Sequence, residues 1–304
     1  MCPVEEIAFE EILKDPFKIK MLSAGQIERL QRELKTLMGK ENALVRLNEP
    51  RPVTFVGDTH GDLRTTISIV SKEFLPLEDK PYLVFLGDYV DRGPNDIANI
   101  NLISMLKVLF PERVVMLRGN HESQEMNNIY GFRRAASDHP CIGEGGFKRY
   151  QEVFAAMPHG VLLEWNRVFG VHGGIPFDPH HEGPFSLGEL KALKKTKLLG
   201  DLEEASRQMM WGDPSEDVPA EERFEFNFKR GFGYLYGRRI FDEFVERNDI
   251  SLVIRSHQMF EGGYSYFFDN RLLSIFSTKH YGGYDIEPHY ARIDVDGSFQ
   301  LLEV

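Results

Sequence analysis

Three short polar segments lie about thirty residues apart in the first half of the chain, and each contains residue types whose side chains can bind metal ions. The segments are Gly57–Asp62, Gly87–Gly93 and Arg118–Glu122. Asp58 and His60 are two residues apart, so in an extended segment both side chains point to the same side. Together with Asp88 they form a ligand set that suits a divalent metal. A single segment of this kind is most often a polar turn, but three in succession favour a metal site.

Each polar segment follows an apolar run that reads as a buried strand. These predicted strands are Val53–Val56, Tyr82–Leu86 and Val114–Leu117. Apolar residues at helical spacing follow the first two segments, one set from Leu63 to Phe74 and the other from Ile97 to Leu106. The sequence therefore predicts parallel strands joined by helices, with the polar segments gathered at the carboxyl ends of the strands, where open α/β sheets bind ligands.

The remaining patterns are shorter and are spread along the chain. Ser23 and Gln26 have the spacing of a capping box at the start of a helix. A further helix is predicted to end near Pro158, and a short one is predicted over Leu187–Lys194. Later strands are expected at Val161–Leu163, Val168–Val171, Ser251–Ile254, Leu272–Phe276 and Tyr290–Val295.

Composition narrows the function classes. The net charge of −11 disfavours binding to nucleic acid and to anionic membranes. The longest apolar stretch, residues 102–110, contains Lys107 and is too short to span a bilayer. The acidic start of the chain predicts no signal peptide. Cys2 and Cys141 are the only cysteines, so we expect no disulfide framework, a structural role for Cys141, and a reducing, cytoplasmic location.

The three segments resemble the signature of the phosphoprotein phosphatase family, the metal-dependent serine/threonine phosphatases, and are most similar to the protein phosphatase 1 and 2A branch. The resemblance continues, in the family's order, through His172-Gly173-Gly174, Trp211-Gly212-Asp213-Pro214, Arg230-Gly231, Arg255-Ser256-His257-Gln258 and Tyr281-Gly282. It implies an α/β fold of the metallophosphoesterase type, a β-sandwich of mixed sheets flanked by α-helices in a single domain. We expect residues 1–50 to form an N-terminal helical extension that packs on the core, and residues 51–304 to form the catalytic domain.

The resemblance also implies a centre of two divalent metal ions. Its ligands would be Asp58, His60, Asp88, Asn120, His172 and His257, with Asp88 bridging the two ions. Manganese is the first candidate in vitro, and iron and zinc are the alternatives, since affinity alone does not choose the occupant. A hydroxide that bridges the metals would attack the phosphorus directly.

The resemblance assigns the remaining roles to four loops. Arg92, Arg230, Asn120 and Tyr281 would bind the substrate, and each guanidinium could hold two phosphate oxygens. His121 would protonate the leaving serine or threonine, while Asp91 would hold its other ring nitrogen and keep the imidazolium charged near neutral pH. Asp213 is expected near the cleft. The histidines predicted to lie outside the site, at the surface or in turns, are His139, His159, His180, His181 and His289.

The predicted function is hydrolysis of phosphoserine and phosphothreonine in phosphorylated proteins. The alternatives are a phosphohydrolase of nucleotides such as dinucleoside polyphosphates and a pseudophosphatase that binds phosphoproteins without hydrolysis. Two departures from the family's pattern, at Lys279–His280 and at Gly282, put the shape of the loop near Tyr281 in doubt. Neither departure affects a predicted metal ligand. The sequence predicts no particular regulatory subunit.

Overall fold

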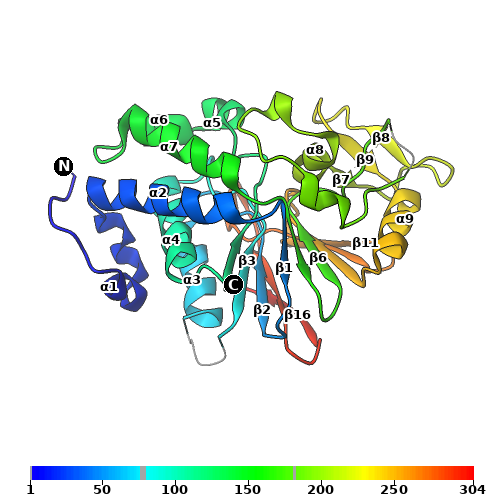
Figure 1. The fold of residues 1–304 in the computed structure, drawn as a ribbon, viewed down its shortest axis with the longest axis horizontal. Helices are drawn as coiled ribbons and strands as arrows, with labels where there is room; N and C mark the ends of the chain where they lie inside the picture. Colours follow the sequence, from blue (N-terminus) through cyan, green and yellow to red (C-terminus); the bar gives the residue numbers. More distant parts are fainter. Residues whose placement is uncertain (1, 76–79, 181–182) are drawn as a thin grey trace.

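The computed structural model describes residues 2–75, 80–180 and 183–304. Two β-sheets stack at the centre of the molecule, and helices flank them on both sides (Figure 1). The α-helices are α1 (Phe9–Lys14), α2 (Ala24–Lys40), α3 (Leu63–Glu73), α4 (Asp96–Leu109), α5 (Gln124–Tyr130), α6 (Phe132–Asp138), α7 (Gly143–Ala156), α8 (Glu204–Trp211) and α9 (Arg238–Asn248). Short 3₁₀ turns are η1 (Pro16–Met21), η3 (Glu189–Ala192) and η4 (Leu199–Asp201).

The first sheet carries the three strands that precede the polar segments. Its order is β16 (Phe299–Glu303), β15 (His289–Ile293), β2 (Val53–Val56), β3 (Tyr82–Phe85) and β4 (Val114–Met116). Strands β2, β3 and β4 are parallel, and β15 is antiparallel to β2. Since α3 and α4 form the crossovers, the polar segments after β2, β3 and β4 lie at the same edge of this sheet.

The second sheet is also mixed. Its order is β1 (Leu44–Leu47), β5 (Gly160–Leu163), β6 (Val168–Val171), β10 (Leu252–Arg255), β12 (Leu272–Ile275) and β11 (Tyr264–Phe267). Two smaller units follow: a sheet of β7 (Asp213–Pro214), β9 (Tyr234–Tyr236) and β8 (Phe224–Phe226), and a hairpin of β13 (His280–Tyr281) and β14 (Tyr284–Asp285).

One core fills the space between the two large sheets. It includes Phe55 and Val84 from the first sheet and Leu163, Ile254 and Leu273 from the second, and all five are buried. Such burial of both inner faces is what holds a β-sandwich together. The predicted fold class, an α/β sandwich of mixed sheets flanked by helices, is therefore confirmed.

The first 50 residues contain the predicted helix, but they end in a strand and not in a helix. The Ser23 side chain accepts from the Gln26 N–H, and the Gln26 side chain accepts from the Ser23 N–H, which completes the capping box of α2. Helix α2 packs against α4 and α7. Residues 44–47 are not helical: β1 pairs in parallel with β5 at the edge of the second sheet. The division of the chain near residue 50 stays a prediction.

The two cysteines, which were expected to provide no disulfide framework, do form one disulfide. Cys2 and Cys141 form a disulfide with a Cα–Cα distance of 5.2 Å, and they are 139 residues apart in sequence. The bond joins the start of the chain to the loop between α6 and α7. The Cys141 side chain is buried in the core, so its predicted structural role is confirmed in a form that the sequence did not indicate.

Candidate metal and phosphate site

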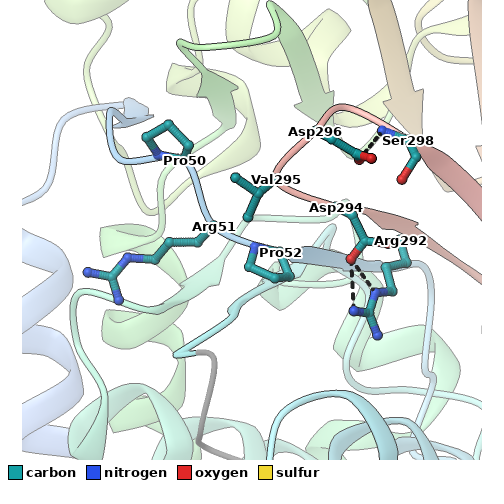
Figure 2. Close-up of a pocket in the computed structure, with 8 residues that line it drawn as sticks. All are labelled: Pro50, Arg51, Pro52, Arg292, Asp294, Val295, Asp296 and Ser298. Carbon is teal, nitrogen blue, oxygen red and sulfur yellow. Dashed lines mark hydrogen bonds and ion pairs between the residues drawn. The ribbon is translucent and has the colours of Figure 1, made fainter.

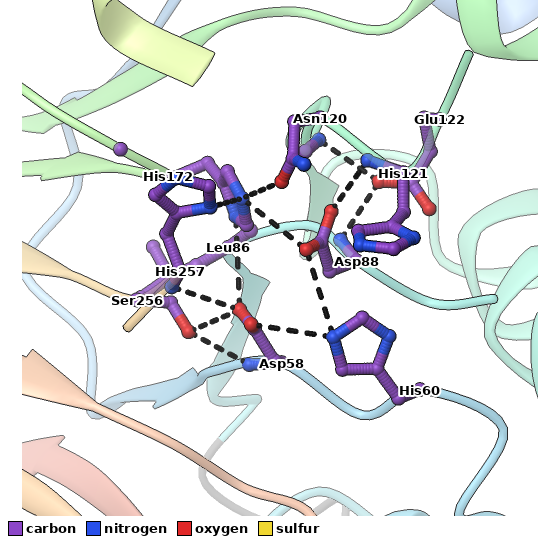
Figure 3. A network of polar contacts seen from close by, with 12 residues as sticks. Asp58, His60, Leu86, Asp88, Asn120, His121, Glu122, His172, Ser256 and His257 are labelled. Atoms are coloured by element: carbon purple, nitrogen blue, oxygen red, sulfur yellow. Dashed lines mark hydrogen bonds and ion pairs between the residues drawn. The ribbon is translucent and has the colours of Figure 1, made fainter. Parts of the chain in front are cut away.

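The predicted site residues converge from five strand ends of both large sheets. Loops after β2, β3 and β4 carry residues 58–60, 88–92 and 120–121, while loops after β6 and β10 carry His172 and His257. Figure 3 shows the ligand side chains that the motifs predict gathered in one place: Asp58, His60, Asp88, Asn120, His172 and His257. The site therefore lies where the carboxyl ends of strands from both sheets meet, as expected from the positions of the motifs.

The backbone of this region is unusual as well as crowded. His60, Asp88, Asp91, Arg92 and His257 all have positive φ, between 39° and 72°. Non-glycine residues rarely adopt this conformation, and it is concentrated at functional sites because the surrounding contacts must enforce it. These five residues are the only predicted site residues with positive φ among the residues that the structure describes.

Two motif glycines permit the close approach of the loops. A Cβ atom on Gly93 would lie 1.7 Å from the carbonyl oxygen of His60, and one on Gly119 would lie 2.1 Å from Oδ1 of Asp88. Both distances are far below van der Waals contact, so any side chain would push the three motif loops apart. The glycines in the motifs are therefore required for packing.

Asp88 occupies the centre of the cluster. Its Oδ1 accepts from the backbone N–H of His121 at 2.9 Å. Its Oδ2 lies 3.7 Å from Nε2 of His60 and 3.5 Å from Nε2 of His172. This places one oxygen between two imidazoles from different sheets, the position expected of a bridging carboxylate.

Hydrogen bonds fix which atoms of the histidines face the cluster. Nδ1 of His60 lies 3.0 Å from the carbonyl oxygen of Val90, and Nδ1 of His172 lies 3.1 Å from that of Leu86. The Nε2 atoms of both rings are thereby directed inward. Nε2 of His172 also lies 3.1 Å from both Oδ1 of Asn120 and Nδ1 of His257.

The unpaired atoms fit a metal. Ser256 Oγ and the His257 N–H donate to Oδ1 of Asp58, which leaves its Oδ2 buried without a hydrogen bond among the described residues. Nε2 of His60 is also buried without a hydrogen bond there, and the two atoms lie 3.5 Å apart. Buried polar atoms without partners are costly and rare. Clusters with metal-binding spacing are His60–Asp88–His121 and Asp88–His172–His257.

The pKa shifts agree with a cationic occupant. Burial, then the charges of Asp58 and Glu122, raise the pKa of Asp88 well above its ordinary value. A bound cation would relieve this crowding of carboxylates, because it stabilises their ionised forms. Burial lowers the pKa of His172 to about 3, and burial with the charge of Arg230 lowers the pKa of His257 well below its ordinary value. Both rings are therefore neutral, as ligands must be.

His121 and Asp91 form the predicted pair. Nδ1 of His121 lies 2.9 Å from Oδ2 of Asp91, which also accepts from Asn127, while Oδ1 of Asp91 accepts from the Phe132 N–H. Burial lowers the pKa of His121 to about 4, although Asp91 opposes the shift. In the free site Asp91 does not outweigh the effect of burial. The expectation that Asp91 keeps the imidazolium charged near neutral pH stays a prediction. A ring nitrogen of His121 lies within 4.8 Å of ligand atoms of His60 and Asp88, which is close enough for His121 to share in binding an ion.

The site opens into a cavity of about 1010 Å³ that is lined by the predicted phosphate-binding arginines and by Tyr281. Arg92 lies between the rings of Tyr130 and Tyr281, with its Cζ atom 4.1 Å and 4.7 Å from their centroids. Arg230 is held differently, by two hydrogen bonds to the carboxylate of Asp213.

A second cavity, of about 510 Å³, lies away from the motifs, beside the turn between β15 and β16 (Figure 2). Its carboxylates already accept hydrogen bonds: Asp294 accepts from Arg292, and Asp296 accepts from the Ser298 N–H. No residue from the three motifs lines it. It therefore offers no comparable set of free ligand atoms.

Sequence reasoning gave no role to several residues that hold the site together. Glu122 accepts from the backbone N–H groups of Asp88, Tyr89 and Gly119, which ties two motif loops to each other. Ser256 Oγ donates to Oδ1 of Asp58 and accepts from the Asp58 N–H, which ties the loop after β10 to the loop after β2. Their positions inside the recognised motifs were the available signal.

The structure describes four of the five histidines predicted to lie outside the site, and none of these four belongs to the clusters with metal-binding spacing. His139, His180 and His289 lie away from the cluster, and His181 is outside the described residues. His159 was expected at the surface or in a turn and is instead fully buried, with neither ring nitrogen paired among the described residues.

Comparisons with known proteins decide the family. The profile of the calcineurin-like phosphoesterases matches residues 51–260. The chain belongs to this family. It is 31% identical over 268 residues to a catalytic subunit of protein phosphatase 2A from Dictyostelium discoideum, and the match covers 87% of this chain and 80% of the relative.

Two further members extend the comparison. A probable serine/threonine-protein phosphatase of Encephalitozoon cuniculi is 34% identical over 91% of this chain, which spans only 57% of that relative's length. A solved Saccharomyces cerevisiae protein serine/threonine phosphatase, described as similar to human PP5, has the same fold with a TM-score of 0.84. The match covers 97% of this chain and 95% of that one at 24% identity. This calcineurin-like phosphoesterase thus resembles serine/threonine phosphatases in both sequence and fold.

Proposed function

We propose that this calcineurin-like phosphoesterase is a serine/threonine protein phosphatase that hydrolyses phosphoserine and phosphothreonine with the help of two divalent metal ions. The observation that carries the proposal is the convergence of six metal-binding side chains from five strand ends beside the His121–Asp91 pair. The relatives named as protein phosphatases support the choice of substrate.

We propose that the six ligand residues form two groups, one for each ion. Asp58 and His60 would hold one, Asn120, His172 and His257 the other, and Asp88 both. When bound, the ions would supply Lewis acidity and lower the pKa of a water held between them. We propose manganese, iron or zinc as occupants, because the set mixes imidazole, carboxylate and amide ligands.

Arg92 and Arg230 line the same cavity as the metal ligands. We propose that their guanidinium groups hold the phosphate oxygens, and that Asn120 and Tyr281 complete the contacts. Arg230 is already oriented by Asp213, so little side-chain freedom is lost when phosphate binds. The charge that develops on the equatorial oxygens during phosphoryl transfer is what such a pair stabilises.

His121 would give its proton to the leaving oxygen. Its low pKa in the free site means that Asp91 alone does not keep the ring charged. A dianionic phosphate bound beside the ring adds negative charge, which favours the imidazolium. We therefore propose that His121 takes up its proton when the substrate binds, while Asp91 fixes Nδ1 and leaves Nε2 toward the leaving group.

The test compares two leaving groups. In His121→Asn, turnover of a phosphoserine peptide should fall by about 10²–10⁴, the usual range for general acid catalysis. Turnover of an aryl phosphate, whose leaving group needs no proton, should fall much less. His180→Asn, at an exposed position, is the matched control and should behave as wild type.

The metal content of each variant and the rate at which each hydrolyses a dinucleoside polyphosphate are measured in parallel. Equal losses on both substrates with metal retained would exclude His121 as the acid. Faster cleavage of the nucleotide would favour the nucleotide phosphohydrolase, and tight phosphopeptide binding without turnover in manganese would favour a pseudophosphatase.

Phosphorylated proteins are the proposed partners, and the absence of nucleic-acid and membrane partners stays a prediction. No helix in the described part of the chain could cross a bilayer. The predicted cytoplasmic location is opposed by the disulfide, because disulfides persist mainly in oxidising compartments.

A further inference from the structure

The guanidinium of Arg92 is held in a way that leaves its N–H groups free. It lies between the rings of Tyr130 and Tyr281, and within the described residues no carboxylate pairs with it. Cation–π contacts orient a guanidinium through its faces. The donors at its edge therefore stay available for phosphate oxygens, in contrast to those of Arg230, part of which bond to Asp213.

The position of Tyr281 depends on a small hairpin. Strands β13 and β14 are joined by Gly282 and Gly283, whose φ values of 59° and 90° suit a tight two-residue turn. The Tyr281 ring packs 4.9 Å from the ring of His60 and 5.1 Å from that of Phe276, measured between centroids. Each strand of the hairpin has only two residues, so it needs an anchor outside itself.

Asp62, the last residue of the first motif, provides that anchor. Its Oδ2 accepts from the backbone N–H of Lys279 at 3.0 Å, directly before β13, and lies 3.5 Å from Oγ1 of Thr278. The same carboxylate caps α3: Oδ1 accepts from the Thr65 N–H at 3.1 Å, and Oδ2 accepts from Oγ1 of Thr65 at 2.7 Å. Asp62 thus links the loop after β2 to the hairpin that carries Tyr281.

We propose that Asp62 is a positioning residue for phosphate binding, which acts by holding the β13–β14 hairpin so that Tyr281 keeps Arg92 in place. The inference rests on the proposed function, since it takes Arg92 as a phosphate-binding group. Asp62 itself binds neither metal nor substrate. Its removal should therefore weaken the hold on phosphate while the metal centre remains.

Asp62→Asn is the appropriate change because it keeps the shape of the side chain. An amide presents one acceptor oxygen, so it cannot serve both the Thr65 N–H and the Lys279 N–H. The inhibition constant of inorganic phosphate and the KM for a phosphoserine peptide should both rise about fivefold to tenfold, the scale of one lost hydrogen bond. The kcat should change less than KM, and metal content should be unchanged.

Thr65→Val is the matched control. It removes the hydroxyl that bonds to Asp62 but leaves the bond to Lys279, so the phosphate constants should stay close to wild type. A second comparison uses Arg92→Ala as the background. If Asp62 acts through Arg92, adding Asp62→Asn there should cost little more, and the two changes should be strongly non-additive.

Full additivity of the two changes, or an unchanged phosphate constant in Asp62→Asn with the protein folded, would overturn the proposal. Loss of bound metal in Asp62→Asn would also overturn it, because the defect would then arise at the metal centre. Phosphate binding can be measured by calorimetry even if no phosphopeptide is hydrolysed. A failure of the proposed function is therefore distinguishable from a failure of this inference.

Discussion

The disulfide between Cys2 and Cys141 should contribute strongly to stability. It closes a loop of 139 residues in the unfolded chain. A loop of this length loses about 17 cal/mol/K of entropy when it is closed, which corresponds to about 5 kcal/mol at 25 °C. The unfolding entropy of the 304-residue chain is roughly 640 cal/mol/K. Loss of the disulfide should therefore lower Tm by about 8 °C.

Thermal unfolding of Cys2→Ser, followed by circular dichroism without reductant, measures this shift. Cys2 is preferred to Cys141 because Cys141 is buried in the core, where a hydroxyl would add a second effect. Val4→Ser, at a residue that is 94% exposed, is the matched control and should melt as wild type. Reductant should lower the Tm of wild type to that of Cys2→Ser and leave the variant unchanged.

Two results would refute the reasoning. The first is a Tm for Cys2→Ser within about 2 °C of wild type, since the loop entropy predicts several times that shift. The second is the absence of a linked peptide pair containing Cys2 and Cys141 in a non-reducing digest. Catalytic turnover at 25 °C should be the same in both proteins, because neither cysteine lines the cavity that holds the predicted site.

Two further changes test the buried polar groups. Asp213→Asn leaves the fully buried Arg255 without its anionic partner and frees Arg230 from its carboxylate. We expect the free energy of unfolding, measured in urea, to fall by about 3 kcal/mol and the KM for a phosphopeptide to rise. An unchanged KM would contradict the role of Asp213 in orienting Arg230. Burial lowers the pKa of His159 to about 3 from its ordinary 6.5. Between these pH values the unfolded chain binds a proton at His159 that the folded chain does not, so the stability of the fold decreases as the pH drops below 6.5. Between pH 7 and pH 5, the free energy of unfolding of His159→Gln should therefore decrease by about 2 kcal/mol less than that of wild type. Equal decreases in the variant and in wild type would exclude His159 as the cause of the pH dependence.

The parts of the fold that the sequence predicted are those encoded by local patterns. Helices α3 and α7 and the strands before the three motifs follow from apolar spacing, and the capping box of α2 from two side chains. Strand β1 was missed because four residues carry little periodicity, and they become a strand only by pairing with β5 far along the chain. Helix α9 was missed although Ile240, Phe241, Phe244 and Val245 have helical spacing.

For the candidate site too, some features were predicted from the sequence motifs and others were not. The motifs predicted which residues gather, because each follows a strand and strand ends meet at one edge. They did not predict the bond between Arg230 and Asp213, the pairing of Cys2 with Cys141, or the low pKa of His121. Each of these depends on distances between distant segments or on burial, which no local pattern contains.

The two arginines illustrate why this distinction matters for function. Sequence treats Arg92 and Arg230 as equivalent phosphate ligands, yet the structure restrains one with a carboxylate and the other with two aromatic rings. Asp213 lowers the positive charge that Arg230 can offer, whereas Tyr130 and Tyr281 leave the full charge and all the donors of Arg92 available. Arg92 should therefore contribute more than Arg230 to holding a dianionic phosphate, and the contacts that place Arg92 should matter more to binding than those that place Arg230.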